Sequence, residues 1–139
     1  MERERRSERF IWENQSFVVF APWASVHPLE FWIFPKKHVS TPAKMQKKEV
    51  EAFAKTLRIC LGALKTLVNN PAYNYGFHIA PAKDAEAKKY YHWHLEVYPK
   101  LAIWAGFEKS TGVYINTVPP EDSAEELRKA AVEEEKKLG

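Results

Sequence analysis

The chain has 139 residues, a length that fits one domain with its own core, and we expect a single domain over 1–139 with residues 1–8 frayed. The net charge of +3 is low and no face is dense in lysine and arginine, so nucleic acid is not an expected partner. The most apolar stretch, 17–34, is broken by His27, Pro28 and Glu30, which argues against a membrane span, and the single cysteine fits a cytoplasmic protein.

Short apolar or alternating runs bounded by turn residues predict strands in the first third of the chain and again after the middle. The predicted strands lie at 9–13, 16–21, 30–35, 73–81 and 91–98. Residues 82–89 are expected to form a polar loop. The stretches 102–108 and 112–116 look extended on either side of a turn at Lys109–Gly112.

Apolar residues recurring every three or four positions predict a long helix that ends at Asn69 and Asn70. Ser40 or Thr41 is the expected N-cap, with Pro42 at the first helical position. A second, charged helix is predicted from Pro119-Pro120 to about residue 137. The residues expected to face the core are Val50, Phe53, Leu57, Cys60, Leu61, Leu64 and Val68 in the first helix and Ala124, Leu127 and Ala131 in the second.

This order of elements is typical of an α+β domain. We expect a mostly antiparallel sheet with the long helix across one face and a C-terminal helix beside it. The sequence shows no internal repeat and no boundary of a second domain.

His92, His94 and Glu96 alternate with Trp93 and Leu95 in a predicted strand. Alternate side chains of a strand share a face, so the two imidazoles and the carboxylate are expected to lie together. A neutral imidazole can attack phosphorus or bind a metal ion, and a neighbouring carboxylate can hold its tautomer. The alternative is a set of structural or solvated polar residues, because a short His-x-His pattern also arises by chance.

Two other histidines lie in or next to predicted strands. His38 follows the third predicted strand, and His78 lies inside the fourth. Neighbouring strands could bring them to His92, and three imidazoles suffice for a zinc site with one open position. For either residue alone a structural role is equally compatible with the sequence. His27, in a loop before a proline, is expected at the surface.

The stretch 104–116 combines glycines with polar side chains. Gly106 and Gly112 would let the backbone approach a ligand, Lys109 could offset a phosphate charge, and Glu108 could accept hydrogen bonds from sugar hydroxyls. A plain β-hairpin explains the spacing equally well. The spacing of a Walker loop is absent.

Taken together, four stretches resemble the carboxy-terminal half of the galactose-1-phosphate uridylyltransferase family, a branch of the histidine triad superfamily. They are APWASVHPLEFWIFPKKH, NPAYNYGFHIAP, YHWHLEVYPKL and AGFEKSTGVYINTVPPED, in that order. The likeness is strongest to plant-type and thermophile-type members, which include ADP-glucose phosphorylase. The resemblance implies a histidine-triad-like domain and a role in galactose and carbohydrate metabolism.

In that family a first domain carries the nucleophilic histidine in an H-P-H-x-Q or H-S-H-x-Q motif, which is absent here. The resemblance places His94 at the equivalent position of the second domain, which in the family usually lacks catalytic competence. It implies that the second domain binds the hexose phosphate or nucleotide sugar, reaching a neighbouring subunit's active site. The substrate-binding residues carried over are Ile103, Trp104, Ala105, Gly106, Phe107 and Glu108.

The resemblance also raises two possible metal sites. The family's second domain can hold zinc through a cysteine pair and histidines that match His38 and His92, but the pair would fall at or before Arg3 and is missing. In other members a metal uses histidines like His78 together with those of the triad strand. Zinc therefore stays a possible cofactor, with His38, His78 and His92 as candidate ligands.

Three functions follow as hypotheses. The first is the sugar-phosphate-binding half of a uridylyltransferase-like enzyme that works with a separately encoded catalytic half on a UDP-sugar or ADP-sugar and a hexose 1-phosphate. The second is a self-sufficient homodimeric nucleotidyl hydrolase or transferase that uses His94 as its nucleophile, oriented by His92 and Glu96. The third is a sugar-nucleotide-binding domain without catalysis. The chemistry implied for the first two is nucleotidyl transfer through a histidine-bound nucleotide.

Overall fold

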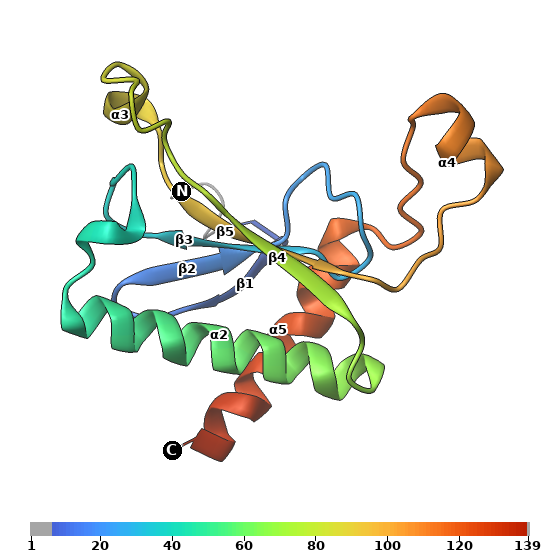
Figure 1. Ribbon diagram of the computed structural model, residues 1–139. Helices are drawn as coiled ribbons and strands as arrows, with labels where there is room; N and C mark the ends of the chain where they lie inside the picture. The colour runs from blue at the N-terminus through green and yellow to red at the C-terminus, as the bar shows by residue number, and fades with distance from the viewer. Residues whose placement is uncertain (1–6, 139) are drawn as a thin grey trace.

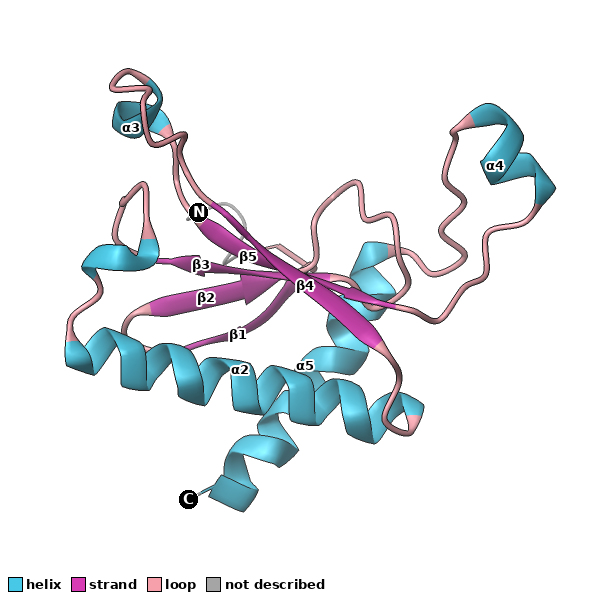
Figure 2. Cartoon of the chain, viewed as in Figure 1, coloured by secondary structure: helices cyan, strands magenta, loops and turns pink. Residues whose placement is uncertain are grey.

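A computed structural model describes residues 7–138 and shows one five-stranded antiparallel sheet (Figures 1 and 2). The strands follow the order β1-β2-β3-β5-β4 across the sheet. Their bounds are Phe10–Glu13 for β1, Phe17–Phe20 for β2, Phe31–Pro35 for β3, Tyr73–His78 for β4 and His94–Pro99 for β5. The last two strands pair over six positions, from Tyr73 opposite Pro99 to His78 opposite His94.

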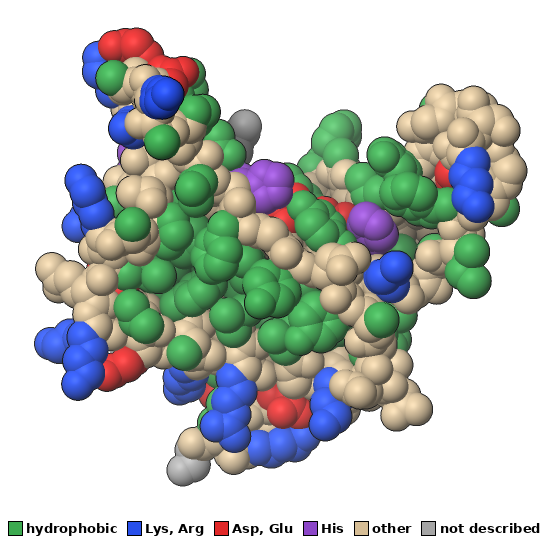
Figure 3. All heavy atoms as spheres, in the orientation of Figure 1, with side chains coloured by type: hydrophobic (Ala, Val, Ile, Leu, Met, Phe, Trp, Pro, Cys, Tyr) green, Lys and Arg blue, Asp and Glu red, His purple; other side chains and the backbone are tan. Residues whose placement is uncertain are grey.

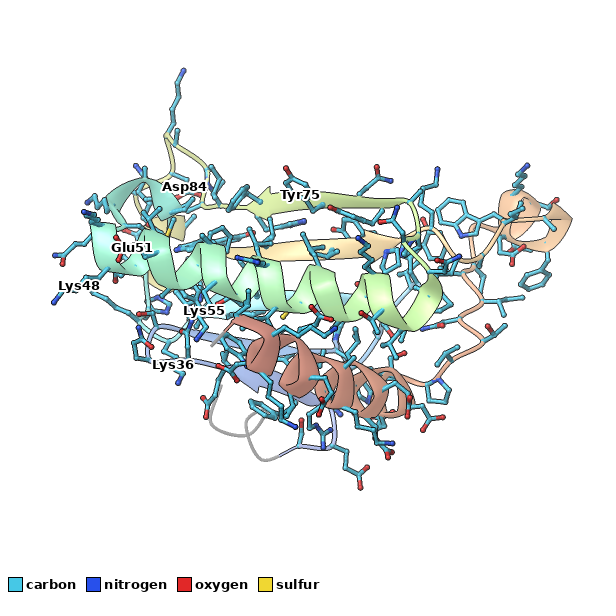
Figure 4. All side chains as sticks on the ribbon, turned by 90° about the horizontal axis from the view of Figure 1, so that it is seen from below. Lys36, Lys48, Glu51, Lys55, Tyr75 and Asp84 are labelled. Atoms are coloured by element: carbon cyan, nitrogen blue, oxygen red, sulfur yellow. The ribbon has the colours of Figure 1, made fainter. Side chains whose placement is uncertain are left out.

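Two long helices, α2 (Lys47–Val68) and α5 (Pro120–Leu138), lie side by side against one face of the sheet (Figure 4). Three shorter helices sit in the connections: η1 at Pro42–Lys44, α3 at Ala87–Tyr90 and α4 at Gly106–Thr111. The prediction of an α+β, mostly antiparallel fold with one long helix across a face and a C-terminal helix is confirmed. Within residues 7–138 no helix has the length and apolar character needed to cross a membrane.

The long helix begins later than predicted. Thr41 caps the short helix η1, where its hydroxyl accepts a hydrogen bond from the amide of Ala43. Met45 then adopts an extended conformation that stops η1, and α2 begins after Gln46, whose amide donates to the Glu49 carboxylate at 2.7 Å. The predicted end is correct, because Asn69 takes the left-handed conformation and closes the last turn.

The prediction of two extended stretches, 102–108 and 112–116, on either side of a turn at Lys109–Gly112 is wrong for residues 106–111. Residues 106–111 form α4 instead, on an arm (residues 101–116) that stands away from the sheet (Figure 1). Glu108 caps the start of this helix by accepting from the amide of Ala105 at 3.1 Å, and Gly112, with a φ of 71°, ends it. Local hydrogen bonds decide here, since none of the described strands pairs with the arm. The predicted loop at 82–89 likewise contains the start of α3.

The hydrophobic core lies between the sheet and the two long helices. Trp93 and Leu95 are completely buried, and the Trp93 ring meets Phe17 and Phe53 at centroid distances of 6.1 and 5.8 Å. In α5, the residues predicted to face inward, Ala124, Leu127 and Ala131, are buried as expected. The buried side chains anchor this part of the chain in the core. Because alternate side chains point to opposite faces, the side chains on the other face of β5 are held in fixed positions as well.

Cys60 is buried in the middle of α2, and burial raises the pKa of its thiol far above the usual range. We expect the native protein to react with a thiol reagent such as DTNB only as fast as it unfolds, and the urea-unfolded chain to release one equivalent at once. Stopped-flow absorbance at pH 8 measures both rates. Rapid reaction of the folded protein would contradict the burial of this thiol.

Candidate functional site

The face of the sheet turned away from α2 carries a row of stacked rings that crosses four strands. Phe20 of β2 stacks on Phe34 of β3 at 5.1 Å, and Phe34 stacks on His94 of β5 at 4.5 Å. His94 in turn stacks on His78 of β4 at 5.0 Å, with an interplanar angle of 13°. The imidazole of His94 is thus held between two parallel rings, and only its edge can meet a polar partner.

The two ring nitrogens of His94 have different partners. Nδ1 lies 3.1 Å from the carbonyl oxygen of His92, which can only accept, so Nδ1 carries a proton. Nε2 lies 2.9 Å from Oε1 of Glu96. One further proton must lie between these two atoms, on the imidazole or on the carboxyl group. Nε2 is therefore engaged by Glu96.

Tyr98 and His78 complete the cluster around the buried Glu96 carboxyl group. The Tyr98 hydroxyl donates to Oε2 of Glu96, and its oxygen lies 3.2 Å from Nε2 of His78. The same His78 nitrogen is 3.5 Å from Oε1 of Glu96. Burial, followed by the neighbouring Glu96 and Glu30, raises the pKa of Tyr98, so its phenol keeps its proton at neutral pH.

His78, His94 and Glu96 have the spacing of a metal site. Each offers one ligand atom, and these three atoms lie within 4.8 Å of one another. Two imidazole nitrogens and a carboxylate oxygen suit zinc or iron(II), and three protein ligands leave positions open for water or substrate. The donor set therefore fits a metal ion. Binding would displace the proton that His94 and Glu96 share.

His92 and His38 lie apart from this cluster. Their rings meet edge to face at 5.0 Å, but Nε2 of His92 is 2.7 Å from the Pro35 carbonyl oxygen and Nε2 of His38 is 3.2 Å from that of Lys89. Burial lowers the pKa of His92, which favours its neutral form. His78 does not join these two residues. The structure thus divides the predicted polar row, leaving His94 and Glu96 in contact and His92 linked to His94 through its backbone.

The predicted substrate-binding residues are on the arm, outside the sheet. Ile103 is 94% exposed, and Phe107 and Glu108 lie on α4 with exposed or half-buried side chains. Trp104 is the most firmly held, because its ring packs on His27 at 6.1 Å and on Tyr114 at 4.9 Å. The other predicted positions, Ala105 and Gly106, form the start of α4.

The sequence analysis did not identify Glu30 as the acceptor that holds a loop and a neighbouring indole in place. This carboxyl group is 2% exposed; Oε2 accepts from the amides of Val26 and His27 at 2.8 and 3.0 Å, and Oε1 accepts from the Trp32 indole at 2.9 Å. Trp32 packs on His94 at 5.1 Å. Through Trp32, Glu30 therefore connects the cluster around Glu96 with the loop that holds His27. A charged residue at the start of an apolar strand was the available signal.

A family model for a domain of unknown function, DUF4921, matches residues 4–138. The chain belongs to the DUF4921 family. Its relatives among characterised proteins include ADP-glucose phosphorylase of Arabidopsis thaliana, 37% identical over 131 residues, covering 93% of this chain and 37% of the relative. Galactose-1-phosphate uridylyltransferase of Thermotoga maritima is 33% identical over 133 residues, covering 91% of this chain and 42% of the relative.

Solved structures agree with these relationships. The crystal structure of an Arabidopsis thaliana ADP-glucose phosphorylase with bound ADP-glucose superimposes with a TM-score of 0.83 at 38% identity, over 87% of this chain and 40% of that one. A zinc-bound histidine triad protein from Mycobacterium smegmatis shares the fold, with a TM-score of 0.63 at 17% identity, over 92% of this chain and 86% of that one. The resemblance to the uridylyltransferase family and the histidine-triad-like fold are confirmed. This DUF4921 domain spans about two fifths of the length of these enzymes.

Proposed function

We propose that this DUF4921 domain is the sugar-phosphate-binding half of a nucleotidyl-transfer enzyme, and that the catalytic half lies outside these 139 residues. The observation that carries the proposal is the arm, which stands away from the sheet (Figure 1) and exposes Ile103 and Phe107. The arm leaves 54% of Phe107 exposed, while the carboxyl group of Glu108 is half-buried and also accepts from the amide of Ala105. The arm is well placed to reach a site formed by a second domain.

The outer strand of the sheet is the proposed docking edge for that half. β4 pairs with β5 on one side, and within the described residues no strand pairs with its other side. It exposes Tyr75 at 61%, Phe77 at 46% and the following Ile79 at 49%; Figure 4 shows Tyr75 at the margin of the molecule beyond α2. An apolar edge strand left open favours pairing with another strand. The matched segment covers only 37% and 42% of the two relatives named above, so each of them carries more than half of its length outside this segment, in the same polypeptide.

The candidate ligands are a UDP-sugar or ADP-sugar together with a hexose 1-phosphate, as the names of the relatives suggest. On this proposal Glu108 accepts hydrogen bonds from sugar hydroxyls, and His78, His94 and Glu96 hold a metal ion such as zinc that stiffens the sheet beside the arm. His94 then acts as a ligand. The ligand atoms of His78 and Glu96 within 4.8 Å of that of His94 favour this role over that of a nucleophile.

A chimaera tests the function. Residues 7–138 would replace the homologous segment of the Thermotoga maritima uridylyltransferase, and exchange between a nucleotide sugar and hexose 1-phosphate would be assayed with UDP-glucose and with ADP-glucose. We expect exchange, and a fall in kcat/KM of about 10- to 100-fold in Glu108→Ala, the loss of a hydrogen bond to a charged group.

The matched control is Glu125→Ala, which removes an exposed carboxylate from α5 and should leave exchange unchanged. A folded chimaera without exchange, or one indifferent to Glu108→Ala, would contradict the proposal. If the unfused 139-residue protein instead formed an acid-labile nucleotide adduct that His94→Ala abolished, the self-sufficient enzyme would replace it. Nucleotide-sugar binding without exchange in any combination would identify a non-catalytic domain.

A further inference from the structure

The end of the arm is tied to the loop that precedes β3, residues 25–30, which we call the anchor loop. Nδ2 of Asn116 donates to the carbonyl oxygen of Ser25 at 3.1 Å, to its hydroxyl at 3.0 Å and to the carbonyl oxygen of His27 at 3.4 Å. Oδ1 of Asn116 accepts from the amide of Val118 at 3.1 Å. One side-chain amide therefore joins the returning limb of the arm to the anchor loop, beside which it runs in Figure 1.

The start of the arm contacts the same loop through aromatic rings. Trp104 packs on His27 at 6.1 Å with an interplanar angle of 24°, and Tyr114, near the end of the arm, packs on Trp104 at 4.9 Å. Figure 3 shows hydrophobic side chains gathered between the body of the domain and the arm. Both limbs of the arm thus rest on residues 25–30, one through a ring and the other through hydrogen bonds.

The anchor loop is in turn fixed to the body of the domain. Besides the Glu30 carboxylate described above, the buried hydroxyl of Ser123 on α5 accepts from the amide of Leu29 at 3.2 Å. Leu29 is buried and has a φ of 58°, in the left-handed region that a bulky side chain rarely adopts. Such a conformation persists only where the surrounding structure enforces it. The loop is therefore a rigid support rather than a loose connection.

The position of α4 depends on these attachments. No residue of α4 is buried, so the helix is not held by the hydrophobic core. Glu108 lies on this helix, and its place relative to a ligand follows the direction of the whole arm. A displacement of about 1 Å in a group that contacts a reacting molecule can lower a rate on the order of 100-fold.

We propose that Asn116 is a positioning residue, which fixes the direction of the arm against the anchor loop and thereby the place of Glu108. Asn116 spends its hydrogen bonds within the chain and acts on the ligand only through the arm. The inference rests on the proposed function for its effect on catalysis, but the attachment itself can be measured in the unfused protein. Asn116→Asp is the informative change, because it sets a carboxylate oxygen against the oxygens of Ser25 and keeps the acceptor for Val118.

Limited trypsin digestion of the unfused 139-residue protein tests the attachment. We expect cleavage after Lys109, identified by mass spectrometry, to be at least about fivefold faster in Asn116→Asp, since loss of the hydrogen bonds raises the population in which the arm is open. The matched control is Asn70→Asp, the same change at an exposed asparagine after α2, which should leave this cleavage rate unchanged.

A double-mutant cycle in the chimaera tests the effect on catalysis. Asn116→Asp should lower kcat/KM about tenfold on its own and cause almost no further loss in a Glu108→Ala background, because a residue that acts through Glu108 has nothing left to position. A general loss of stability would instead lower kcat/KM equally in both backgrounds. Ser25→Ala, which removes one of the acceptors of Asn116, should have the same pattern with a loss of about two- to fivefold.

Circular dichroism checks folding, and the milder Ser25→Ala keeps the test decisive if Asn116→Asp does not fold. Unchanged cleavage after Lys109 in the folded variants, or losses in kcat/KM that add to that of Glu108→Ala, would overturn the inference. A chimaera without exchange, combined with faster cleavage in Asn116→Asp, would remove the proposed function and support Asn116 as the residue that holds the arm. Exchange by the chimaera with additive losses would leave the function and remove the role of Asn116.

Discussion

Replacing His94 by alanine, or Glu96 by glutamine, is expected to lower the affinity for zinc by at least about 100-fold, because each removes a direct ligand from a three-ligand site. The protein as prepared would be stripped with a chelator and titrated with Zn²⁺ against a chromophoric competitor. We expect one ion per chain. Affinity should also fall at acidic pH, since protonated imidazoles cannot bind metal.

His38→Ala is the matched control, because His38 belongs to the other histidine pair and is linked to His92 rather than to the cluster. Its removal should leave zinc binding unchanged. The opposite result, loss in His38→Ala with Glu96→Gln unaffected, would move the metal to the pair that the missing cysteines would have completed. Release of about one proton per ion at neutral pH would support displacement of the proton shared by His94 and Glu96.

Glu30→Ala is expected to cost about 3–5 kcal/mol of the free energy of unfolding, because it strands the amides of Val26 and His27 and the Trp32 indole without their acceptor. Glu30→Gln should cost less, since its amide oxygen still accepts. Urea unfolding followed by circular dichroism measures both. Glu51→Ala on the exposed side of α2, where the side chain is 65% exposed, should change stability by less than about 0.5 kcal/mol. If Glu30→Ala lowered the free energy of unfolding by less than about 1 kcal/mol, the net contribution of one hydrogen bond, the loop would not depend on the carboxylate.

Most of the fold could be predicted because the sequence pattern and the packing agree. Phe31 and Ile33 alternate with Trp32 and Phe34, and the structure buries the first pair in the core between the sheet and the long helices and places the second on the opposite face. The arm could not be predicted in the same way. Its exposed Ile103 and Val113 resemble strand residues, but within residues 7–138 no strand pairs with the arm, and a short capped helix forms between them at 106–111.

The arrangement of the candidate site could be predicted only in part. The alternation of His94 and Glu96 correctly placed them on one face, whereas the partners of each nitrogen depend on strands far away in sequence. His78 meets His94 because β4 and β5 align these two residues, and that register is invisible before the sheet is built. The direction of His92 toward the Pro35 carbonyl is equally non-local. Glu30 escaped notice for the same reason, since its donors come from a loop that folds back on it.

The stack formed by Phe34, His94 and His78 has a spectroscopic consequence. Circulating π-electrons in the rings above and below His94 generate local magnetic fields, which should move its carbon-bound proton resonances upfield of those of an exposed histidine. These signals would stand apart in a one-dimensional proton spectrum of a protein with only five histidines. The His94 proton resonances can therefore report, without isotope labelling, on any ion or ligand that contacts the edge of this ring.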